Sequence, residues 1–271
     1  MASKLTKKVH GLLKSNLLDL PEIDISNLND GLRLLAKWRS ILIQNTLIEK
    51  EGTEIVRGPF KGMKFLAESS EGCHVAKLLG TYEQPLHRYI DIITNRPYQR
   101  VVNIGCAEGY YAIGLALLMK ESEILAYDTN ASAQEACDQL AFKNNVQGRV
   151  STFGEINSED LTESLLKDAI IFCDIEGAEV NLLNPDTAPA LREVDLVVES
   201  HECLVPGVTE KLKAWFKETH NIQEVIDDGM RAVENPPQWF EQLSHLDQLL
   251  ATWEWRSGPT PWLVMQKKNR A

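Results

Sequence analysis

A glycine loop between an apolar run and a helical pattern is the first feature of the sequence that suits ligand binding. Residues 101–119 read VVNIGCAEGYYAIGLALLM, where the apolar run ends at Gly105 and a second glycine follows at Gly109. In open α/β sheets, ligands bind beyond the carboxyl ends of the strands, commonly at the first strand-to-helix turn. A glycine there permits a sharp turn and a close approach of a ligand to the backbone. The alternative is a glycine turn that binds nothing.

The spacing of the two glycines indicates which ligand the loop suits. It is GxxxG, whereas a dinucleotide site needs the closer GxGxxG glycines that make room for a pyrophosphate. Glu108 lies in the same loop and would repel phosphate groups. An anionic loop instead suits a ligand that carries an amine and a sulfonium. The spacing therefore argues against a dehydrogenase that binds NAD.

A carboxylate follows the next apolar run at the distance expected for ribose recognition. Asp128 closes residues 123–128 and lies about 20 residues beyond the glycine turn, where an acidic side chain commonly accepts hydrogen bonds from ribose hydroxyls. The alternative is a helix N-cap, but Asn130 or Ser132 can serve as the cap of the following helix. Together with the glycine turn, Asp128 is predicted to bind a ribose.

Two further strand ends bring together carboxylates and a histidine. The string CDIEGAE places Asp174, Glu176 and Glu179 within six positions after an apolar run, and VVESHEC places Glu199 and His201 after the next one. Clustered carboxylates are costly without a cation, a hydrogen-bonding substrate or solvent. Histidine is the natural proton acceptor near neutral pH. The alternatives are a solvated acidic loop and a histidine that only makes structural hydrogen bonds.

The elements that position these residues alternate between apolar strands and helical segments from Pro97 onward. Such alternation predicts a parallel sheet with helices on both faces. The predicted strands are 100–105, 123–128, 149–153, 169–174, 194–199, 222–227 and 262–267, and the predicted helices are 110–120, 132–144, 158–167 and 208–219. No crossover helix other than a polar, aromatic insert precedes 262–267, so this last strand is expected to be antiparallel.

The chain on either side of this pattern predicts two additions to the sheet. Residues 5–50 show helical spacing broken near Pro21 and Asn29, and residues 53–67 alternate like a short hairpin. We therefore expect an N-terminal helical and hairpin extension over 1–75, outside the sheet, and a main domain over 76–271. A helical insert is expected over about 228–260.

Three strings together resemble a known family. They are GTYEQPLHRYIDIITNRPYQRVVNIGCAEGYYAIGLAL (80–117), YDTN (127–130) and DIEGAEVNLL (174–183). The sequence is similar to the FkbM-type branch of class I S-adenosylmethionine-dependent methyltransferases over roughly residues 77–205, and DIEGAE is its most specific part. The resemblance implies a Rossmann-like seven-stranded methyltransferase sheet with a reversed last strand. It also implies S-adenosylmethionine as the cofactor.

The resemblance assigns cofactor contacts to positions on several strand ends. The glycine loop would line the methionine and ribose parts, Asp128 would hold the ribose hydroxyls, and the residues after the third strand would lie near the adenine. The chain departs from the family pattern at Asn103, where relatives carry a carboxylate that helps to recognise the methionine ammonium. The predicted cofactor-binding residues are Glu83, Asn103, Gly105, Cys106, Ala107, Gly109, Tyr110, Asp128, Gly154, Glu155 and Asp174.

The predicted activity is methyl transfer to a hydroxyl of a small molecule or sugar. The cofactor provides the activation, so the protein must align the acceptor and remove a proton. We predict His201 as the base, oriented by Asp174 or Glu199, which makes these three the catalytic residues. A variant assigns the same three side chains to a divalent metal that binds the acceptor hydroxyl. The opposing hypothesis is a non-catalytic module that binds a cofactor or a protein.

The acceptor itself is not encoded in a recognisable motif. Trp239, Phe240, Trp253 and Trp255 in the insert, and Trp38 in the extension, are expected either to line a pocket over the sheet edge or to pack on the sheet. The N-terminal helices serve either as a lid or as an interface between copies of the chain.

Composition narrows the classes of partner and compartment. The formal net charge is −11 over 271 residues, which disfavours nucleic acid, because phosphate backbones are bound by clusters of Lys and Arg. Five scattered cysteines form no CxxC pair, so neither a zinc site nor a redox motif is expected from them, and a reducing, cytoplasmic setting fits best. The N-terminus reads as an amphipathic helix rather than a signal peptide, and no membrane span is expected.

Overall fold

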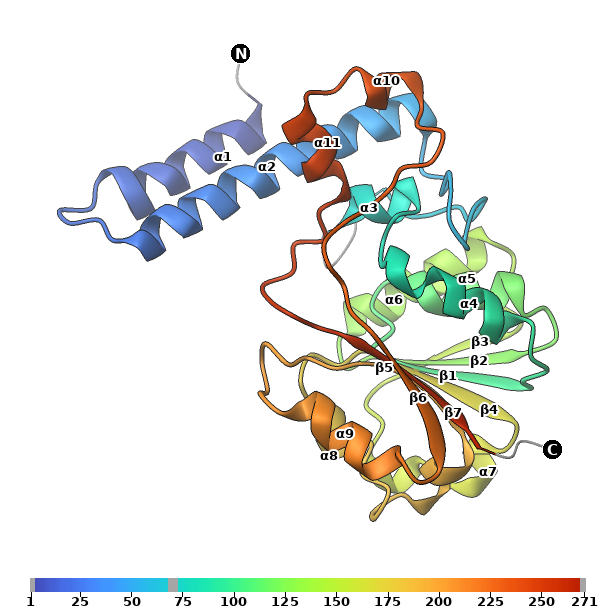
Figure 1. Ribbon diagram of the computed structural model, residues 1–271. Coiled ribbons are helices and arrows are strands. Elements are labelled where there is room, and N and C mark those ends of the chain that lie inside the picture. Colours follow the sequence, from blue (N-terminus) through green and yellow to red (C-terminus); the bar gives the residue numbers. More distant parts are fainter. Residues whose placement is uncertain (1–2, 68–72, 269–271) are drawn as a thin grey trace.

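The computed structural model describes residues 3–67 and 73–268 and is built around one seven-stranded sheet (Figure 1). The strands run in the order β3-β2-β1-β4-β5-β7-β6, and β7 is antiparallel to both of its neighbours. They are β1 (Arg100–Ile104), β2 (Glu123–Tyr127), β3 (Val150–Phe153), β4 (Ala169–Cys173), β5 (Asp195–Glu199), β6 (His220–Val225) and β7 (Trp262–Lys267). The predicted fold class, including the reversed last strand, is confirmed.

Helices cover both faces of the sheet. In Figure 1, α4, α5 and α6 lie on one side and α7, α8 and α9 on the other. Between residues 74 and 216 the α-helices are α3 (His74–Leu79), α4 (His87–Thr94), α5 (Tyr110–Leu118), α6 (Ala131–Lys143), α7 (Glu163–Leu166), α8 (Glu179–Leu182) and α9 (Val208–Phe216). The same part of the chain has short 3-10 helices at η2 (Gln84–Leu86), η3 (Ser158–Asp160) and η4 (Pro189–Glu193).

The central strands are apolar on both faces because each face is covered by helices. Phe172 and Val197 point into the hydrophobic cluster beneath α5, whereas Ile171 and Val198 point into a second cluster on the opposite face. A strand that is buried on both sides loses the alternation of polar and apolar residues that marks a half-exposed strand. This is the physical reason why the apolar runs in the sequence predict the strands well.

The N-terminal extension consists of α1 (Lys4–Leu13), the single turn η1 (Lys14–Leu18) and the long helix α2 (Ile25–Glu51). The break expected near Pro21 is present. The break expected near Asn29 is wrong, because α2 begins at a capping box in which Asp24 and Asn27 satisfy each other's backbone amides, and then runs through Asn29. Figure 1 shows α1 and the first half of α2 extending away from the sheet.

The expected hairpin over 53–67 is a folded-back loop closed by one antiparallel bridge, Glu54 with Lys64, without two regular strands. Its aromatic side chains pack against α5. Phe60 contacts the rings of Tyr110 and Tyr111, and a Cβ placed on Gly114 would come within 2.5 Å of the Phe60 ring. The 1–75 and 76–271 division remains a prediction, but these contacts join the two parts in one hydrophobic cluster.

The expected insert contains two short helices, α10 (Gln238–Glu241) and α11 (His245–Thr252). Helix α11 packs against α2 and α3. From Trp253 the chain returns to the sheet without regular structure and enters β7 at Trp262. We call residues 253–260 the strap. Among the described helices, none has the length and apolar character that crossing a membrane requires.

Candidate active site

The carboxyl ends of the parallel strands border a cavity of about 580 Å³, a volume typical of small-molecule sites. It lies over β1, β2 and β4 and reaches the segment that follows β3. We call it the first cavity. Its lining residues are Ile104, Gly105, Tyr127, Asp128, Thr129, Asn130, Ala133, Gly154, Glu155, Ile156, Asn157, Ser158, Asp174, Ile175, Glu176, Ala178, Asn181 and Leu182.

The glycine loop turns where the backbones of two strands meet. Gly105 has a φ of 78°, and a Cβ at this position would lie 1.6 Å from the carbonyl oxygen of Asp174. Gly109 has a φ of 95° and precedes α5, where a Cβ would lie 2.8 Å from the Cys137 sulfur. Both positions therefore require glycine for reasons of space and backbone conformation.

Asp128 connects the glycine loop to the first cavity. One carboxylate oxygen accepts a hydrogen bond from the Ala107 amide at 2.9 Å, and the other accepts one from the Asn130 amide at 2.8 Å. A carboxylate offers about four acceptor positions, so two remain for a ligand. The side chain is partly exposed and lines the cavity. This placement suits a carboxylate that receives the hydroxyls of a ribose.

The charge of the first cavity distinguishes between ligand classes. Four carboxylates line it, Asp128, Glu155, Asp174 and Glu176, and none of its described lining residues is Lys, Arg or His. A phosphate-bearing dinucleotide would find no cation there, whereas a ligand with an ammonium and a sulfonium would be attracted. The tyrosine ring of Tyr127 and the apolar side chains nearby provide surface for an adenine. The residues present therefore fit S-adenosylmethionine.

Five of the predicted cofactor residues line this cavity and the others do not. Gly105, Asp128, Gly154, Glu155 and Asp174 do so. Cys106, Ala107 and Gly109 are not among its lining residues, although the Ala107 amide donates to Asp128. Tyr110 is buried among Phe60, Phe65 and Tyr82 on the far side of α5, away from the cavity.

Asn103 and Glu108, the polar groups around the loop, are also buried. The Asn103 side-chain amide donates to the Phe172 carbonyl at 3.2 Å, and its side-chain oxygen has no hydrogen-bond partner among the described residues. Glu108 is fully buried and forms a 2.6 Å ion pair with Lys77. Neither side chain lines the first cavity, so the carboxylates at its surface are Asp128, Glu155, Asp174 and Glu176.

A second cavity of about 410 Å³ adjoins the first, and Asp174 and Glu176 line both. Its walls come from four parts of the chain: the extension, the segment from α3 to Tyr82, the strand ends and the strap. Its lining residues are Lys37, Cys73, Lys77, Tyr82, Asp174, Glu176, Glu199, His201, Cys203, Leu204, Glu254, Trp255, Arg256, Ser257 and Thr260. All three predicted catalytic residues, His201, Asp174 and Glu199, line this cavity.

His201 is held by a carboxylate that the sequence did not single out for this role. Its Nδ1 lies 2.6 Å from Glu179, which is fully buried, while its Nε2 faces the second cavity. Asp174 is 3.5 Å and Glu199 3.9 Å from Nε2. Glu179 is thus the carboxylate at hydrogen-bond distance from Nδ1, and the orienting role expected of Asp174 or Glu199 stays a prediction.

The surroundings of His201 favour its protonated form. Burial by itself would lower the pKa of His201, but the hydrogen bond to Glu179 and the charges of Glu199, Glu179 and Glu176 outweigh it, so the pKa is raised above its usual value. With Nδ1 engaged by Glu179, Nε2 is the nitrogen that exchanges a proton with the cavity.

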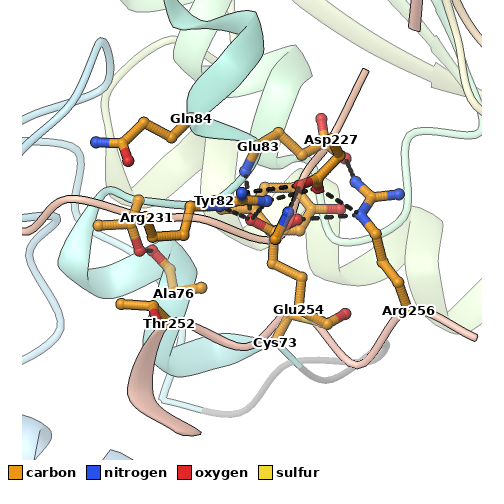
Figure 2. A network of polar contacts seen from close by, with 12 residues as sticks. Cys73, Ala76, Tyr82, Glu83, Gln84, Asp227, Arg231, Thr252, Glu254 and Arg256 are labelled. Atoms are coloured by element: carbon orange, nitrogen blue, oxygen red, sulfur yellow. Dashed lines mark hydrogen bonds and ion pairs between the residues drawn. The ribbon is translucent and has the colours of Figure 1, made fainter. Parts of the chain in front are cut away.

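Glu199 belongs to a buried ion network that fastens the strap. Arg256 contacts Glu199 and Thr260, and it lies 2.8 Å from Glu83 and 3.2 Å from Glu254. Figure 2 shows Arg231 beside Arg256, with the carboxylates of Glu83, Asp227 and Glu254 turned toward the two guanidinium groups. Arg231 pairs with Asp227 at 2.6 Å. Glu83, predicted to contact the cofactor, thus lies in this network and outside the first cavity.

Burial favours the protonated form of the Glu83 carboxyl group. Burial raises the pKa of Glu83 to about 8, the negative charge of Glu199 adds to the rise, and the Arg256 guanidinium opposes it. The Tyr111 hydroxyl donates to Glu83. Protonation reduces the excess of negative charge in a network where four carboxylates meet two guanidinium groups.

The aromatic residues expected near the acceptor have different positions. Trp255 lines the second cavity, where Lys37 of α2 lies 4.7 Å from its ring centroid. Trp239 and Phe240 pack against the hydrophobic cluster, and Trp38 donates to Thr6 between the first two helices. Trp253 lines a separate groove between α2 and α11. The extension and the strap thus form the outer wall of the second cavity.

No family model matches the chain, and no curated protein matches it, so the resemblance to the FkbM-type branch stays a prediction. The solved structures that match include a human methyltransferase 10 domain containing protein (10% identity, 85% of this chain and 96% of that chain, TM-score 0.45). They also include a precorrin-6y methyltransferase of Geobacter metallireducens (13%, 67% and 89%, TM-score 0.43) and the tRNA methyltransferase TrmK of B. subtilis (12%, 67% and 66%, TM-score 0.41). Similarity at this level indicates no substrate.

The arrangement of the two cavities determines which kind of reaction the site could support. The first cavity suits a cationic ligand with a ribose, and the second places a buried imidazole next to the junction with the first. A group held in the first cavity and a molecule held in the second would meet beside Asp174 and His201. Holding two reactants in such contact is the main contribution a protein makes to a displacement reaction.

Proposed function

We propose that the protein is an S-adenosylmethionine-dependent methyltransferase that methylates a hydroxyl of a small molecule. The observation that carries the proposal is the first cavity, which is lined by four carboxylates, has no basic residue among its described lining residues and joins a second cavity at Asp174. The seven-stranded sheet with its reversed last strand is consistent with this activity. When bound, S-adenosylmethionine supplies a methyl group already activated on a sulfonium.

The chain's own residues bind and orient the cofactor. Asp128 would accept the ribose hydroxyls, and Asp174 would attract the ammonium of the methionine part. Glu155 and Gly154 border the end of the cavity toward β3, where the adenine would lie. Gly105 keeps the backbones of β1 and β4 close enough for these side chains to share one site.

The second cavity is proposed to hold the acceptor. Its volume of about 410 Å³ suits a small organic molecule or a sugar unit. Tyr82 and Trp255 offer ring surfaces, and the carboxylates accept hydrogen bonds from hydroxyl groups. A nucleic acid as acceptor is disfavoured, because the net charge is −11 and Arg256, on the cavity wall, is engaged with Glu83 and Glu199.

His201 is proposed to take the acceptor proton. The Nε2 of neutral His201 would accept the proton of the acceptor hydroxyl, and S-adenosylmethionine, when bound, would supply the methyl group and leave as the neutral thioether. Glu179 fixes the ring and stabilises the imidazolium that results. Glu199, tied to Arg256, forms part of the wall and does not need to move.

Binding of the cofactor is tested by calorimetric titration of the full chain with S-adenosylmethionine. We expect one site per chain and no binding of NAD. Asp128→Asn should weaken binding about 10- to 100-fold, since a hydrogen bond to a charged group contributes about 1.5–3 kcal/mol. The exposed Asp186→Asn is the matched control and should bind like the parent protein. If S-adenosylmethionine does not bind, the proposal is wrong.

Transfer is tested separately with methyl-labelled S-adenosylmethionine and a panel of hydroxylated small molecules, sugars and total tRNA. Label in a small molecule or sugar supports the proposed acceptor class, and label in tRNA contradicts it. Binding of the cofactor without transfer to any acceptor would favour the non-catalytic module over the enzyme.

A further inference from the structure

Three possible metal ligands converge where the two cavities meet. Asp174 and Glu176 follow β4, His201 follows β5, and each offers one ligand atom so that all three atoms lie within 4.8 Å of one another. The Nε2 of His201 is 3.5 Å from Asp174 and 3.4 Å from Glu176. His201 is the most buried of the three, with a side chain 5% exposed.

These separations are long for hydrogen bonds and suit the ligands of one metal ion. Nitrogen–oxygen hydrogen bonds are about 2.7–3.2 Å long. Nitrogen and oxygen ligands at about 2.0–2.2 Å from a divalent ion lie about 3.0–3.5 Å apart in tetrahedral or octahedral geometry. The two separations from Nε2 therefore match the spacing of a coordination shell, and the two carboxylate oxygens lie within 4.8 Å of each other.

The other nitrogen of His201 provides an independent indication. Glu179 is fully buried and binds Nδ1 at 2.6 Å, which directs the Nε2 lone pair of the neutral ring toward the two carboxylates. Histidines that bind metals commonly donate their second nitrogen to a carboxylate, which orients the ring and raises its basicity. The backbone amide of Gly177 donates to the same Glu179 oxygen at 3.0 Å and fixes it in turn.

The metal site predicted from the sequence includes Glu199, but the structure places this carboxylate in another ion pair. It lies 3.9 Å from Nε2 and contacts Arg256 of the strap. This leaves three protein ligands and open coordination positions facing the two cavities. Two oxygens and one imidazole favour Zn²⁺ over Mg²⁺, since Mg²⁺ prefers a complete set of oxygen ligands.

We propose that Asp174, Glu176 and His201 form a binding site for a divalent transition-metal ion of the Zn²⁺ class, with Nε2 as the ligand atom of His201. The consequence for catalysis rests on the proposed function: a metal-bound Nε2 has no lone pair to accept the acceptor proton, so an occupied site stops methyl transfer. Metal binding itself does not depend on that function.

The test is a calorimetric titration of the full chain with Zn²⁺, without S-adenosylmethionine. A Cys203→Ser background removes the exposed thiol beside the cavity, and the exposed His245→Ala serves as the matched control. We expect one ion per chain, parent-like binding in His245→Ala, and at least 10-fold weaker binding in Asp174→Asn and His201→Gln. Glu179→Gln should weaken binding about 10-fold, as outer-shell carboxylates do.

The outcomes separate this proposal from the proposed function. Circular dichroism and S-adenosylmethionine titration of the same variants show whether they fold and still bind the cofactor. Unchanged Zn²⁺ affinity in folded His201→Gln and Asp174→Asn would overturn the site, whatever the cofactor result. Specific binding of Zn²⁺ that increases methyl transfer would overturn the expected inhibition and the assignment of His201 as the base.

Discussion

The two nitrogens of His201 have different surroundings, and this difference controls what the residue can do. Nδ1 contacts the buried Glu179, while Nε2 faces a cavity with three carboxylates within 3.9 Å. A histidine whose orientation is fixed on one side and whose other side meets a cavity is suited to accept a proton from a bound molecule. The same geometry makes its pKa dependent on one neighbour in particular.

The first prediction concerns that neighbour. In Glu179→Gln the amide oxygen can still accept from Nδ1, but the negative charge is lost, so the pKa of His201 should decrease relative to the parent protein. Titration of the imidazole resonance by NMR measures this directly, without an acceptor. Glu210→Gln, an exposed change on α9, is the control and should leave the resonance unchanged. An unaltered His201 titration in Glu179→Gln would contradict the assigned contact.

The sequence identifies Asn103 as an unusual position, but it does not predict what surrounds the side chain. The sequence marks it as the place where the chain departs from the family pattern. The structure adds that it is buried, that it donates to Phe172 on the neighbouring strand, and that its oxygen has no partner among the described residues. Partners on an adjacent strand depend on register, which a single sequence does not specify.

At the scale of elements, the strands were predictable and the loops that join them were less so. All seven strands, and the reversal of β7, follow from apolar runs and from the missing crossover helix. The helix break at Asn29 was wrong because a capping box at Asp24 sets the start of α2, and asparagine alone does not end a helix. The segment 53–67, expected as a hairpin, is closed by one antiparallel bridge, and its aromatic side chains pack on α5.

The turn after β1 gives the second prediction. Gly105→Ala should destabilise the protein by more than about 3 kcal/mol or prevent folding, since a Cβ would lie 1.6 Å from the Asp174 carbonyl oxygen and φ is positive. Gly148→Ala is the control, because no atom lies within 4 Å of the added Cβ, and its change should remain within about 0.5 kcal/mol. Urea denaturation compares the two. A parent-like Gly105→Ala would show that β1 and β4 are not held this closely.

The strap gives the third prediction. Arg256→Met leaves Glu83, Glu199 and Glu254 with less compensation in a buried setting and should lower the free energy of unfolding by about 3–5 kcal/mol. Adding Glu83→Gln removes one of these carboxyl groups and should recover part of the loss. Hydrogen exchange should show the largest increase over residues 253–260.

The control for the strap is an exposed ion pair of the same type. Arg192→Met breaks the pair with Asp186 and should cost less than about 1 kcal/mol, because exposed pairs are screened by solvent. If Arg192→Met and Arg256→Met cost the same, the buried network does not fasten the strap.

At the scale of the whole molecule, the second cavity forms where distant parts of the chain meet. Lys37 comes from α2, His201 from the end of β5, and Trp255 and Arg256 from the strap. No local pattern marks these contacts, because ion pairs such as Arg256 with Glu83 join positions far apart in the sequence. The first cavity was predictable in outline because the strand ends of a parallel sheet always meet at one edge.

The last prediction is the pH dependence of global stability that Glu83 imposes. The pKa of this carboxyl is about 8 in the folded protein, against an ordinary value of 4.5. Between these values the folded state holds a proton that the unfolded state has lost, so the free energy of unfolding contributed by Glu83 is fully present below pH 4.5 and is lost as the pH rises toward 8. Each pKa unit corresponds to about 1.4 kcal/mol, which makes the total several kcal/mol.

In Glu83→Gln the neutral amide resembles the protonated acid, so unfolding by urea at a series of pH values should show a smaller decrease in stability between pH 5 and pH 9. At pH 9 the variant should therefore be more stable relative to the parent protein than at pH 5. Parallel stability curves for the two proteins would mean that Glu83 is ionised in the fold, with Arg256 compensating its charge fully.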